Sequence, residues 1–345
     1  MILLLLCLLA TLLSYGLSGL IRNNAVHWGL IDIPNERSSH HTPVPRGGGI
    51  AIALVFMLLA PMLQWYWQSS PPLFLAIYGA GSLIAIVGIL DDRGHIPAHK
   101  RLIIHFVAAF WILYQLDPTV ATMSNIDDPL FWAITTGSVL FLVWLLNLYN
   151  FMDGIDAISG SETLSVALCA ALLSWMLLPD HPTWQLLMLL ASSVTGFLIW
   201  NLPPARLFMG DAGSAFLGII LGTLAIDAAH HSTQLFTSWL ILLGVYLVDA
   251  TVTLSRRILT GEQFYQAHRT HAYQHAAIRL ASHGRVSLGI ALINLLWLFP
   301  LAAAVALDIL SEPLGLLIAY LPLLFLAVHF KAGVRLPPAQ ADSEI

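Results

Sequence analysis

The stretch of sequence that decides the fold is residues 130–160, LFWAITTGSVLFLVWLLNLYNFMDGIDAISG. Its first part, residues 130–146, contains no charged side chain, and its second part places a polar residue at every third position from Asn147 to Asp156. An uncharged apolar run is typical of a helix that crosses a bilayer, whose hydrocarbon core needs roughly 20 such residues. The stretch therefore predicts a membrane-spanning helix that carries polar groups as it leaves the lipid.

The whole chain has the composition that this helix indicates. Of its 345 residues, 58% are hydrophobic and only 10% are charged, whereas soluble domains carry about 25% charged residues. Such a chain has too little polar surface to cover a soluble globule, and it is too apolar to be disordered. The alternating ten-residue pattern of an outer-membrane barrel is absent. We therefore predict an all-α, polytopic integral membrane protein.

Eleven apolar runs are candidate spans. They lie near residues 1–20, 49–64, 74–90, 102–116, 130–146, 162–178, 184–200, 214–229, 236–255, 287–307 and 313–330. Several runs are shorter than 20 residues, so ten spans are also possible. The first run lacks the basic start and the cleavage site of a signal peptide and is expected to be retained as a helix. We expect one membrane-embedded domain over residues 1–345 that ends in a short polar tail at 331–345.

The basic residues predict the orientation of these spans. If the N-terminus faces outward, all fourteen Lys and Arg residues fall in the segments on one side of the membrane. Basic residues accumulate in cytoplasmic loops, so this side is predicted to be the cytoplasm. The C-terminal tail is then cytoplasmic as well. The longer, polar loops are also on this side, so we expect the functional site at the cytoplasmic face.

Asp91 and Asp92 follow the apolar run that ends at Leu90. Adjacent residues on a helix point about 100° apart, so we expect the two carboxylates to have distinct roles. The alternative is a solvated acidic helix end, which the helix dipole disfavours at a C-terminus.

The polar residues that follow the fifth run are a more specific motif. They are Asn147, Asn150, Asp153 and Asp156. A regular helix would spread them over half of its circumference, and a tightened or broken backbone around Gly154 would bring them closer together. Clustered carboxylates and carboxamides suit a hard cation or a polar ligand. A helix cap rich in Asn and Asp is the structural alternative.

A second motif, NLPPARLFMGDAGS at 201–214, opens the eighth run. Glycines flank Asp211 at a predicted helix start, where free N–H donors favour phosphate or metal-phosphate. A tight turn is the structural alternative.

Two cytoplasmic loops add cations and imidazoles. Residues 256–275 contain Arg256, Arg257, Arg269 and three histidines within eight residues, starting at His268. Such groups bind anions, although membrane anchoring explains part of the basic charge. The first loop supplies Asp32, Pro34, Asn35, Arg37, His40, His41, Arg46 and the glycines 47–49.

Two further carboxylates lie inside predicted spans. Asp249 is about seven residues from the inner end of its span, a depth at which a carboxylate needs a partner. Asp227, near an outer helix end, is assigned a structural role.

Carboxylates gathered at one face would repel one another unless a divalent cation joined them. Mg²⁺ takes one or two carboxylates together with phosphate oxygens. The pattern indicates a Mg²⁺-dependent phosphoryl transfer on a nucleotide-linked substrate, with a lipid as second substrate. A polytopic transporter and a membrane prenyltransferase are the alternatives; the former should place ionisable groups near the midplane, and the latter should repeat one Asp-rich motif.

These motifs resemble the MraY/WecA-type polyprenyl-phosphate N-acetylhexosamine-1-phosphate transferases, from about Gly29 to about His275. The resemblance implies transfer of a sugar-1-phosphate from a UDP-sugar to undecaprenyl phosphate in the bacterial inner membrane, with release of UMP and with Mg²⁺ or Mn²⁺ as cofactor. The family usually has a run of histidines where this chain reads His271-Ala-Tyr273-Gln274-His275. Only His271 aligns, which resembles the O-antigen-initiating branch more than the peptidoglycan enzyme.

The resemblance also implies roles for individual residues. Asp211 and Asp91 would hold the metal, and Asp91 and Asp92 would lie at the reacting phosphates. The residues implied around the uridine and the phosphates are Asn147, Asn150, Asp153, Asp156, Asn201, Phe208, His40, Arg46, Arg269 and His271. Phe208 would stack on uracil. Direct attack by the lipid phosphate is favoured over a phospho-Asp intermediate on Asp91.

Overall fold

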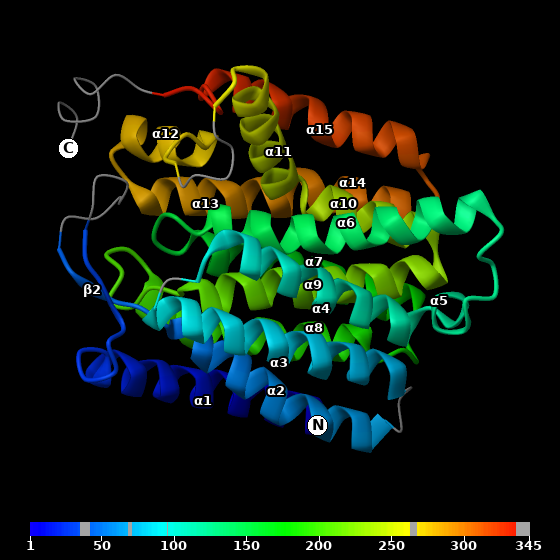
Figure 1. The fold of residues 1–345 in the computed structure, drawn as a ribbon, viewed down its shortest axis with the longest axis horizontal. Helices are drawn as coiled ribbons and strands as arrows, with labels where there is room; N and C mark the ends of the chain where they lie inside the picture. Colours follow the sequence, from blue (N-terminus) through cyan, green and yellow to red (C-terminus); the bar gives the residue numbers. More distant parts are fainter. Residues whose placement is uncertain (35–41, 68–70, 95, 263–267, 336–345) are drawn as a thin grey trace.

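A computed structural model of the protein describes residues 1–34, 42–67, 71–94, 96–262 and 268–335 (Figure 1). Almost all of these residues are helical. The helices are α1 (Ile2–Asn24), α2 (Gly48–Trp67), α3 (Pro71–Arg93), α4 (Ala98–Leu116), α5 (Pro118–Thr122), α6 (Pro129–Met152), α7 (Ile158–Leu177), α8 (Thr183–Asn201), α9 (Asp211–His231), α10 (Thr233–Leu242), α11 (Gly244–Leu259), α12 (Ala272–Leu280), α13 (His283–Ile293), the π-helix η1 (Asn294–Leu298), α14 (Phe299–Ala306) and α15 (Glu312–His329). Two short strands, β1 (Ile31–Asp32) and β2 (Val44–Pro45), pair antiparallel.

The predicted all-helical membrane architecture is confirmed. Among the described residues, nine helices or joined helices are long and apolar enough to cross a membrane, and a bent pair, α10 with α11, would make a tenth. The run predicted at 102–116 lies within α4, which is not among the nine. Its first turn contains His99, Lys100 and Arg101, which lower its mean hydropathy. The expected eleven spans are therefore reached only if α4 and the bent pair are each counted as a membrane-spanning segment.

The span predicted at 236–255 is not one continuous helix. It breaks at Leu243 into α10 and α11, whose axes differ by 69°, and α11 lies across the other helices in Figure 1. No charged side chain lies in α10, whereas α11 carries Asp249, Arg256 and Arg257. Charged side chains are costly in hydrocarbon, which explains why the second half turns away from the spanning direction.

Helix α9 is the centre of the bundle. It packs against α2, α3, α6 and α10. Of an 18-residue apolar stretch of α9, 94% is buried, compared with 22% of such a stretch of α15. The outer helices expose large apolar side chains, among them Leu4 on α1, Leu296 on η1 and Phe325 on α15. Such surfaces are stable against lipid tails, so the core helix is fixed by packing while the outer helices face the membrane.

The start of α2 is in direct contact with the start of α9. A Cβ atom on Gly49 would lie 2.0 Å from the Cα atom of Gly213, so the two backbones touch. The amides of Gly48 and Gly49 each donate a 2.9 Å hydrogen bond, to the carbonyls of Phe208 and Met209. The glycine run at 47–49 therefore positions the residues that lead into α9.

We expect Gly49→Ala to lower the stability of the protein strongly. The added methyl group meets backbone atoms that cannot rotate away, and overpacking of this kind costs about 3 kcal/mol or more. The matched control is Gly137→Ala, because a Cβ at Gly137 on α6 meets no atom within 4 Å. Thermal unfolding in detergent should show a large fall in Tm for Gly49→Ala and little change for the control. Equal Tm values would contradict the contact.

Candidate active site

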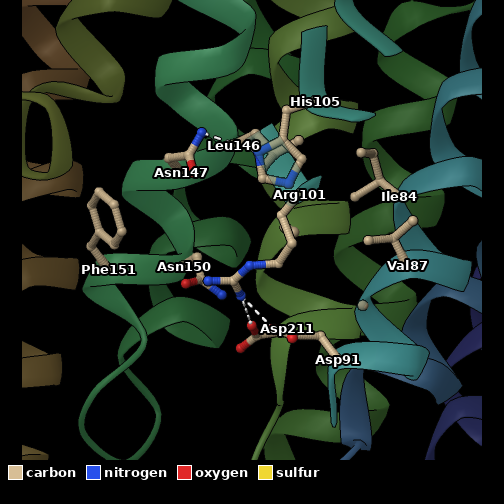
Figure 2. Close-up of a pocket in the computed structure, with 12 residues that line it drawn as sticks. Ile84, Val87, Asp91, Arg101, His105, Leu146, Asn147, Asn150, Phe151 and Asp211 are labelled. Carbon is tan, nitrogen blue, oxygen red and sulfur yellow. Dashed lines mark hydrogen bonds and ion pairs between the residues drawn. The ribbon is translucent and has the colours of Figure 1, made fainter. Parts of the chain in front are cut away.

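A pocket opens where the end of α3 and the start of α9 meet α4 and α6 (Figure 2). Its polar lining consists of side chains that come from four helices. These residues are Asp91, Arg101, His105, Asn147, Asn150 and Asp211. Apolar side chains such as Val87 and Phe151 complete the wall. Residues 120 positions apart in the sequence therefore share one cavity.

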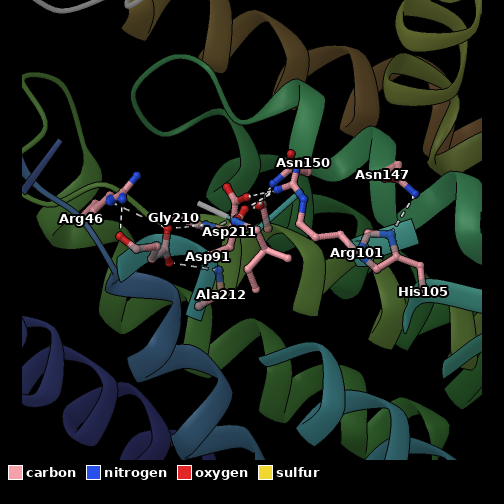
Figure 3. Close-up of polar contacts among 12 residues, drawn as sticks. Arg46, Asp91, Arg101, His105, Asn147, Asn150, Gly210, Asp211 and Ala212 are labelled. Carbon is pink, nitrogen blue, oxygen red and sulfur yellow. Dashed lines mark hydrogen bonds and ion pairs between the residues drawn. The ribbon is translucent and has the colours of Figure 1, made fainter. Parts of the chain in front are cut away.

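Arg101 lies between two carboxylates from different helices. Its Nη1 atom donates to Oδ2 of Asp211 at 2.7 Å and also to Oδ2 of Asp91 (Figures 2 and 3). The other oxygen of Asp91 accepts a 2.7 Å hydrogen bond from the amide of Ile96. Two carboxylate oxygens thus converge on one cationic nitrogen, and in a low-dielectric site such a cation offsets their mutual repulsion.

Asp92 makes different contacts from Asp91, since adjacent residues on a helix point in different directions. Its carboxylate is 1% exposed and accepts hydrogen bonds from the amides of Asp211 (3.1 Å) and Ala212 (3.2 Å). It therefore caps the N-terminus of α9, where an anion is favoured by the helix dipole. Arg46 donates to the backbone carbonyl of Asp92, and its Nε atom lies 3.9 Å from the carboxylate (Figure 3).

Gly210 makes this cap possible. Its φ is +77°, a left-handed conformation that L side chains rarely adopt. A Cβ at this position would also lie 2.6 Å from Oδ2 of Asp92. The glycine before Asp211 therefore allows the carboxylate of Asp92 to reach the free amides of α9.

The end of α6 supplies the two asparagines of the pocket. The amide of Asn147 donates to the carbonyl of Val143 at 2.6 Å and lies 3.2 Å from Nδ1 of His105. Asn150, one turn further, donates to Oγ of Ser214 on α9 at 3.3 Å. The two side chains thus face the pocket from the same side (Figure 3).

Asp153 follows the last residue of α6. Its partial burial raises the pKa of the carboxyl to about 7, and the nearby charge of Asp92 raises it further, while a hydrogen bond from Ser159 opposes these effects. The helix ends at Met152, so Asp153 and Gly154 lie outside its regular backbone.

Asp156 and Asn201 hold the loop that precedes α9. Asp156 accepts from the amide of Ala205 at 3.1 Å and lies 3.3 Å from Nδ1 of His283. Asn201 is buried, and its amide group accepts from the amide of Ala157 and donates to the carbonyl of Leu207, both at 2.9 Å. The side chain of Asn201 is thus occupied by backbone partners, which favours a positioning role over direct ligand contact.

Phe208 lies in that loop and is partly buried. Its amide donates to the carbonyl of Pro45 at 2.8 Å, and its carbonyl accepts from Gly48. These bonds join the loop to β2 and to the start of α2, and they fix the backbone at Phe208.

The buried carboxylate of Asp249 has hydrogen-bond partners, as expected for a charged group inside a predicted span. It accepts from the amides of Ala272 and Tyr273, both at 3.0 Å, and lies 3.3 Å from Nδ1 of His271. It thus caps the N-terminus of α12 from inside the bundle. The hydroxyl of Tyr273 donates to the carbonyl of Phe151 at 3.1 Å, which ties α12 to the pocket wall.

The remaining predicted residues are less closely connected to the pocket. His271 is 3% exposed, and its ring centroid lies 6.5 Å from that of Phe151. Arg269 is partly buried in the preceding loop. His40 lies outside the described residues, as do Asn35, Arg37 and His41.

Arg101 and His105 line the pocket, although no sequence motif singled them out. Arg101 was counted only as one of the basic residues that set the orientation. Arg101 lies at the start of the helix that follows Asp91, and a short turn between two helices brings the start of the second next to the end of the first. This position in the sequence could have indicated that Arg101 lies near Asp91. His105, one helical turn later, points into the same pocket.

The fold and the pocket define a polytopic membrane protein whose charged site is built from the ends of its helices. A family model described as glycosyl transferase family 4 matches residues 74–229. The chain is 27% identical to a probable undecaprenyl-phosphate N-acetylglucosaminyl 1-phosphate transferase of Bacillus subtilis strain 168, over 90% of this chain and 86% of the relative.

Two further relatives are also named as transferases. The chain is 30% identical to a decaprenyl-phosphate N-acetylglucosaminephosphotransferase of Mycobacterium leprae, over 81% of this chain and 78% of the relative. It is 31% identical to a phospho-N-acetylmuramoyl-pentapeptide-transferase of Petrotoga mobilis, over 56% of this chain and 62% of the relative. The chain belongs to glycosyl transferase family 4, the family that contains the MraY/WecA-type enzymes, and it is a membrane-embedded transferase.

The raised pKa of Asp153 predicts a pH-dependent stability. The folded state holds this proton more tightly than the unfolded chain, whose Asp has a pKa of about 3.9. The resulting stability is complete below about pH 4 and is lost as the pH rises through about 7. We expect Tm to fall more steeply between about pH 5 and pH 8 in the unchanged protein than in Asp153→Asn, which cannot ionise. Parallel slopes would show that Asp153 does not titrate in this range.

Proposed function

We propose that the protein transfers a sugar-1-phosphate, an N-acetylhexosamine-1-phosphate, from a UDP-sugar to undecaprenyl phosphate and releases UMP. The observation that carries this proposal is the convergence of Asp91 and Asp211, from two helices, on a single cationic nitrogen in a pocket that also contains Asn147 and Asn150. The relatives are named for transfers of this type onto polyprenyl phosphates.

The donor set fits a Mg²⁺ ion, with Mn²⁺ as an alternative. Mg²⁺ binds through one or two carboxylates and completes its shell with water and substrate phosphate. Asp91 and Asp211 would hold the ion, and their oxygens already share one cation, Arg101. When bound, the metal would neutralise the charge that develops on the UMP leaving group. Arg101 would then be released to contact a substrate phosphate.

The other polar groups would bind the donor. Asn147 and Asn150 face the pocket from α6. Together with Asp153, which follows the last residue of α6, they would offer hydrogen bonds to the ribose and the pyrophosphate. Phe208 would stack on uracil from the loop that Asp156 and Asn201 position. Arg46, Arg269 and His271 would contact phosphate oxygens. Asp92 would act through the cap of α9, which keeps Asp211 in place.

The chemical step needs little acid–base help from the protein. An oxygen of the lipid phosphate attacks the phosphorus atom that carries the sugar, and the bond from this phosphorus to the UMP oxygen breaks. A phosphate monoester has a second pKa of about 6, so the nucleophile is already largely ionised at neutral pH. Asp91 would orient this phosphate or accept a residual proton, and Arg101 would balance its charge. Positioning then supplies most of the acceleration.

The location of the site follows from the basic residues. We place the protein in the bacterial inner membrane with its N-terminus outside and its C-terminus in the cytoplasm, because all fourteen Lys and Arg residues then fall on the cytoplasmic side. The pocket would open on the side from which nucleotide-sugars are supplied. The undecaprenyl-diphosphate-linked sugar so formed would start O-antigen or another cell-envelope polysaccharide.

A UMP-release assay tests the proposed reaction. Purified protein in detergent should release UMP only when undecaprenyl phosphate, Mg²⁺ and one member of a panel of UDP-sugars are all present. Asp211→Ala should lose at least about a hundredfold of this activity at every Mg²⁺ concentration, because a metal ligand contributes several kcal/mol. The control is Asp127→Ala, whose side chain is exposed in the loop before α6. Normal turnover by Asp211→Ala would refute its role.

An exchange experiment separates direct attack from a phospho-Asp91 intermediate. Direct attack predicts that labelled UMP does not enter the UDP-sugar pool when the lipid is absent, because no half-reaction releases UMP. Adding the lipid-linked product should start the exchange, which serves as the positive control. Clear exchange without any lipid would favour the covalent route.

A further inference from the structure

A second cluster of ionisable groups lies at the other end of α9 from the pocket. It consists of Asp227 and His231 on α9 and His181 in the loop between α7 and α8. The 21 residues from Asp211 to His231 rise about 30 Å along the helix. The cluster is thus separated from the candidate active site by the thickness of the bundle, and the proposed reaction makes no use of it.

The three side chains lie close enough together to share one metal ion. One ligand atom from each residue lies within 4.8 Å of the other two. Nδ1 of His181 is 3.5 Å from Oδ2 of Asp227, and the rings of His181 and His231 have centroids 4.5 Å apart. Ligands of a tetrahedral Zn²⁺ at about 2 Å lie roughly 3.3 Å from one another. The three ligand atoms, within 4.8 Å of one another, lie farther apart than this, so a bound ion would draw the side chains together.

The burial of Asp227 gives a reason for a cation at this place. Asp227 is 6% exposed and lies in the last turns of α9, where the helix dipole disfavours a negative charge. The hydroxyl of Thr183 donates to it at 2.8 Å and also lies 2.8 Å from Nδ1 of His181. A hydroxyl carries no charge, so this bond holds the carboxylate in position without neutralising it. His231 is exposed and leaves a path for an ion to enter.

We propose that His181, Asp227 and His231 bind a Zn²⁺ ion, with water in the fourth position. Two imidazoles and one carboxylate are a ligand set that Zn²⁺ accepts, whereas Mg²⁺ prefers oxygen ligands alone. The ion would fasten the loop between α7 and α8 to the end of α9, the helix whose other end carries Asp211. The sequence predicted only a structural role for Asp227, because nothing in its neighbourhood along the chain points to His181.

The neighbouring His230 offers a matched control. Its Nδ1 atom lies 2.9 Å from the carbonyl of Ile226, and its Nε2 atom lies 4.0 Å from Oδ2 of Asp117. Its ring nitrogens are therefore directed to Ile226 and Asp117, and it is not one of the three proposed ligands, although it is adjacent to His231 in the sequence. Replacing it removes an imidazole from the same helix end and leaves the proposed ligands in place.

Metal retention tests the site. Full-length protein, purified in detergent and freed of any histidine tag, is incubated with Zn²⁺ and desalted, and its zinc content is measured by mass spectrometry. We expect a single retained ion in the unchanged protein and in His230→Ala. His231→Ala and Asp227→Asn should bind zinc at least about tenfold more weakly, because each lacks a ligand. Asp211→Ala should retain the ion, which separates this site from the proposed magnesium site.

Co²⁺ provides a spectroscopic check of the coordination. The unchanged protein and His230→Ala should show the intense visible bands of four- or five-coordinate Co²⁺, and His231→Ala should not. His231 is exposed, so its replacement tests the site even if Asp227→Asn does not fold. Zinc retention that is equal in His231→Ala and the unchanged protein, or that is absent from the unchanged protein, would overturn the proposal.

Discussion

The site depends on a single interaction, the ion pair that Arg101 makes with Asp91 and Asp211 at once. Asp91 lies in the last turn of α3, Asp211 is the first residue of α9, and Arg101 lies in the first turn of α4. Two carboxylates at the edge of a bilayer repel each other strongly unless a cation lies between them. The ends of these three helices can therefore meet only around a positive charge. In the proposed reaction a divalent cation would supply that charge.

The packing of α9 supports that arrangement. Close backbone contact at Gly49 and Gly213 fixes how deeply α9 can lie in the bundle. Asp92 then binds the free amides of its first turn, so that the residue next to the proposed metal ligand anchors the helix rather than the ion. The loop before α9 is held at both ends, by β2 and by Asp156. A small displacement of any of these elements would separate Asp211 from Asp91.

Much of the fold could be predicted because hydrophobic runs of about 20 residues have few structural solutions in lipid. The different orientations of the Asp91 and Asp92 side chains also followed from helix geometry, since adjacent residues on a helix point about 100° apart. The break at Leu243 did not, since residues 236–255 remain apolar enough to suggest one span and mean hydropathy does not record a bend. The contact between Arg101 and Asp211 was missed because it joins residues 110 positions apart in the sequence. The partners of Asp249 are closer along the chain, but residue type alone does not show that the amides of Ala272 and Tyr273 turn toward it. The residue type of Asn201 does not show that its side-chain oxygen and nitrogen both form hydrogen bonds with the backbone.

The most direct test of the central claim is a count of bound Mn²⁺ by electron paramagnetic resonance. The His231→Ala background removes any contribution from the second cluster. If Asp91 and Asp211 hold the same ion, each Asp→Asn variant should lose one tightly bound Mn²⁺, and the double variant should lose no more than either single variant. Independent, additive losses, or full retention in both single variants, would show that the two carboxylates do not meet around a shared cation.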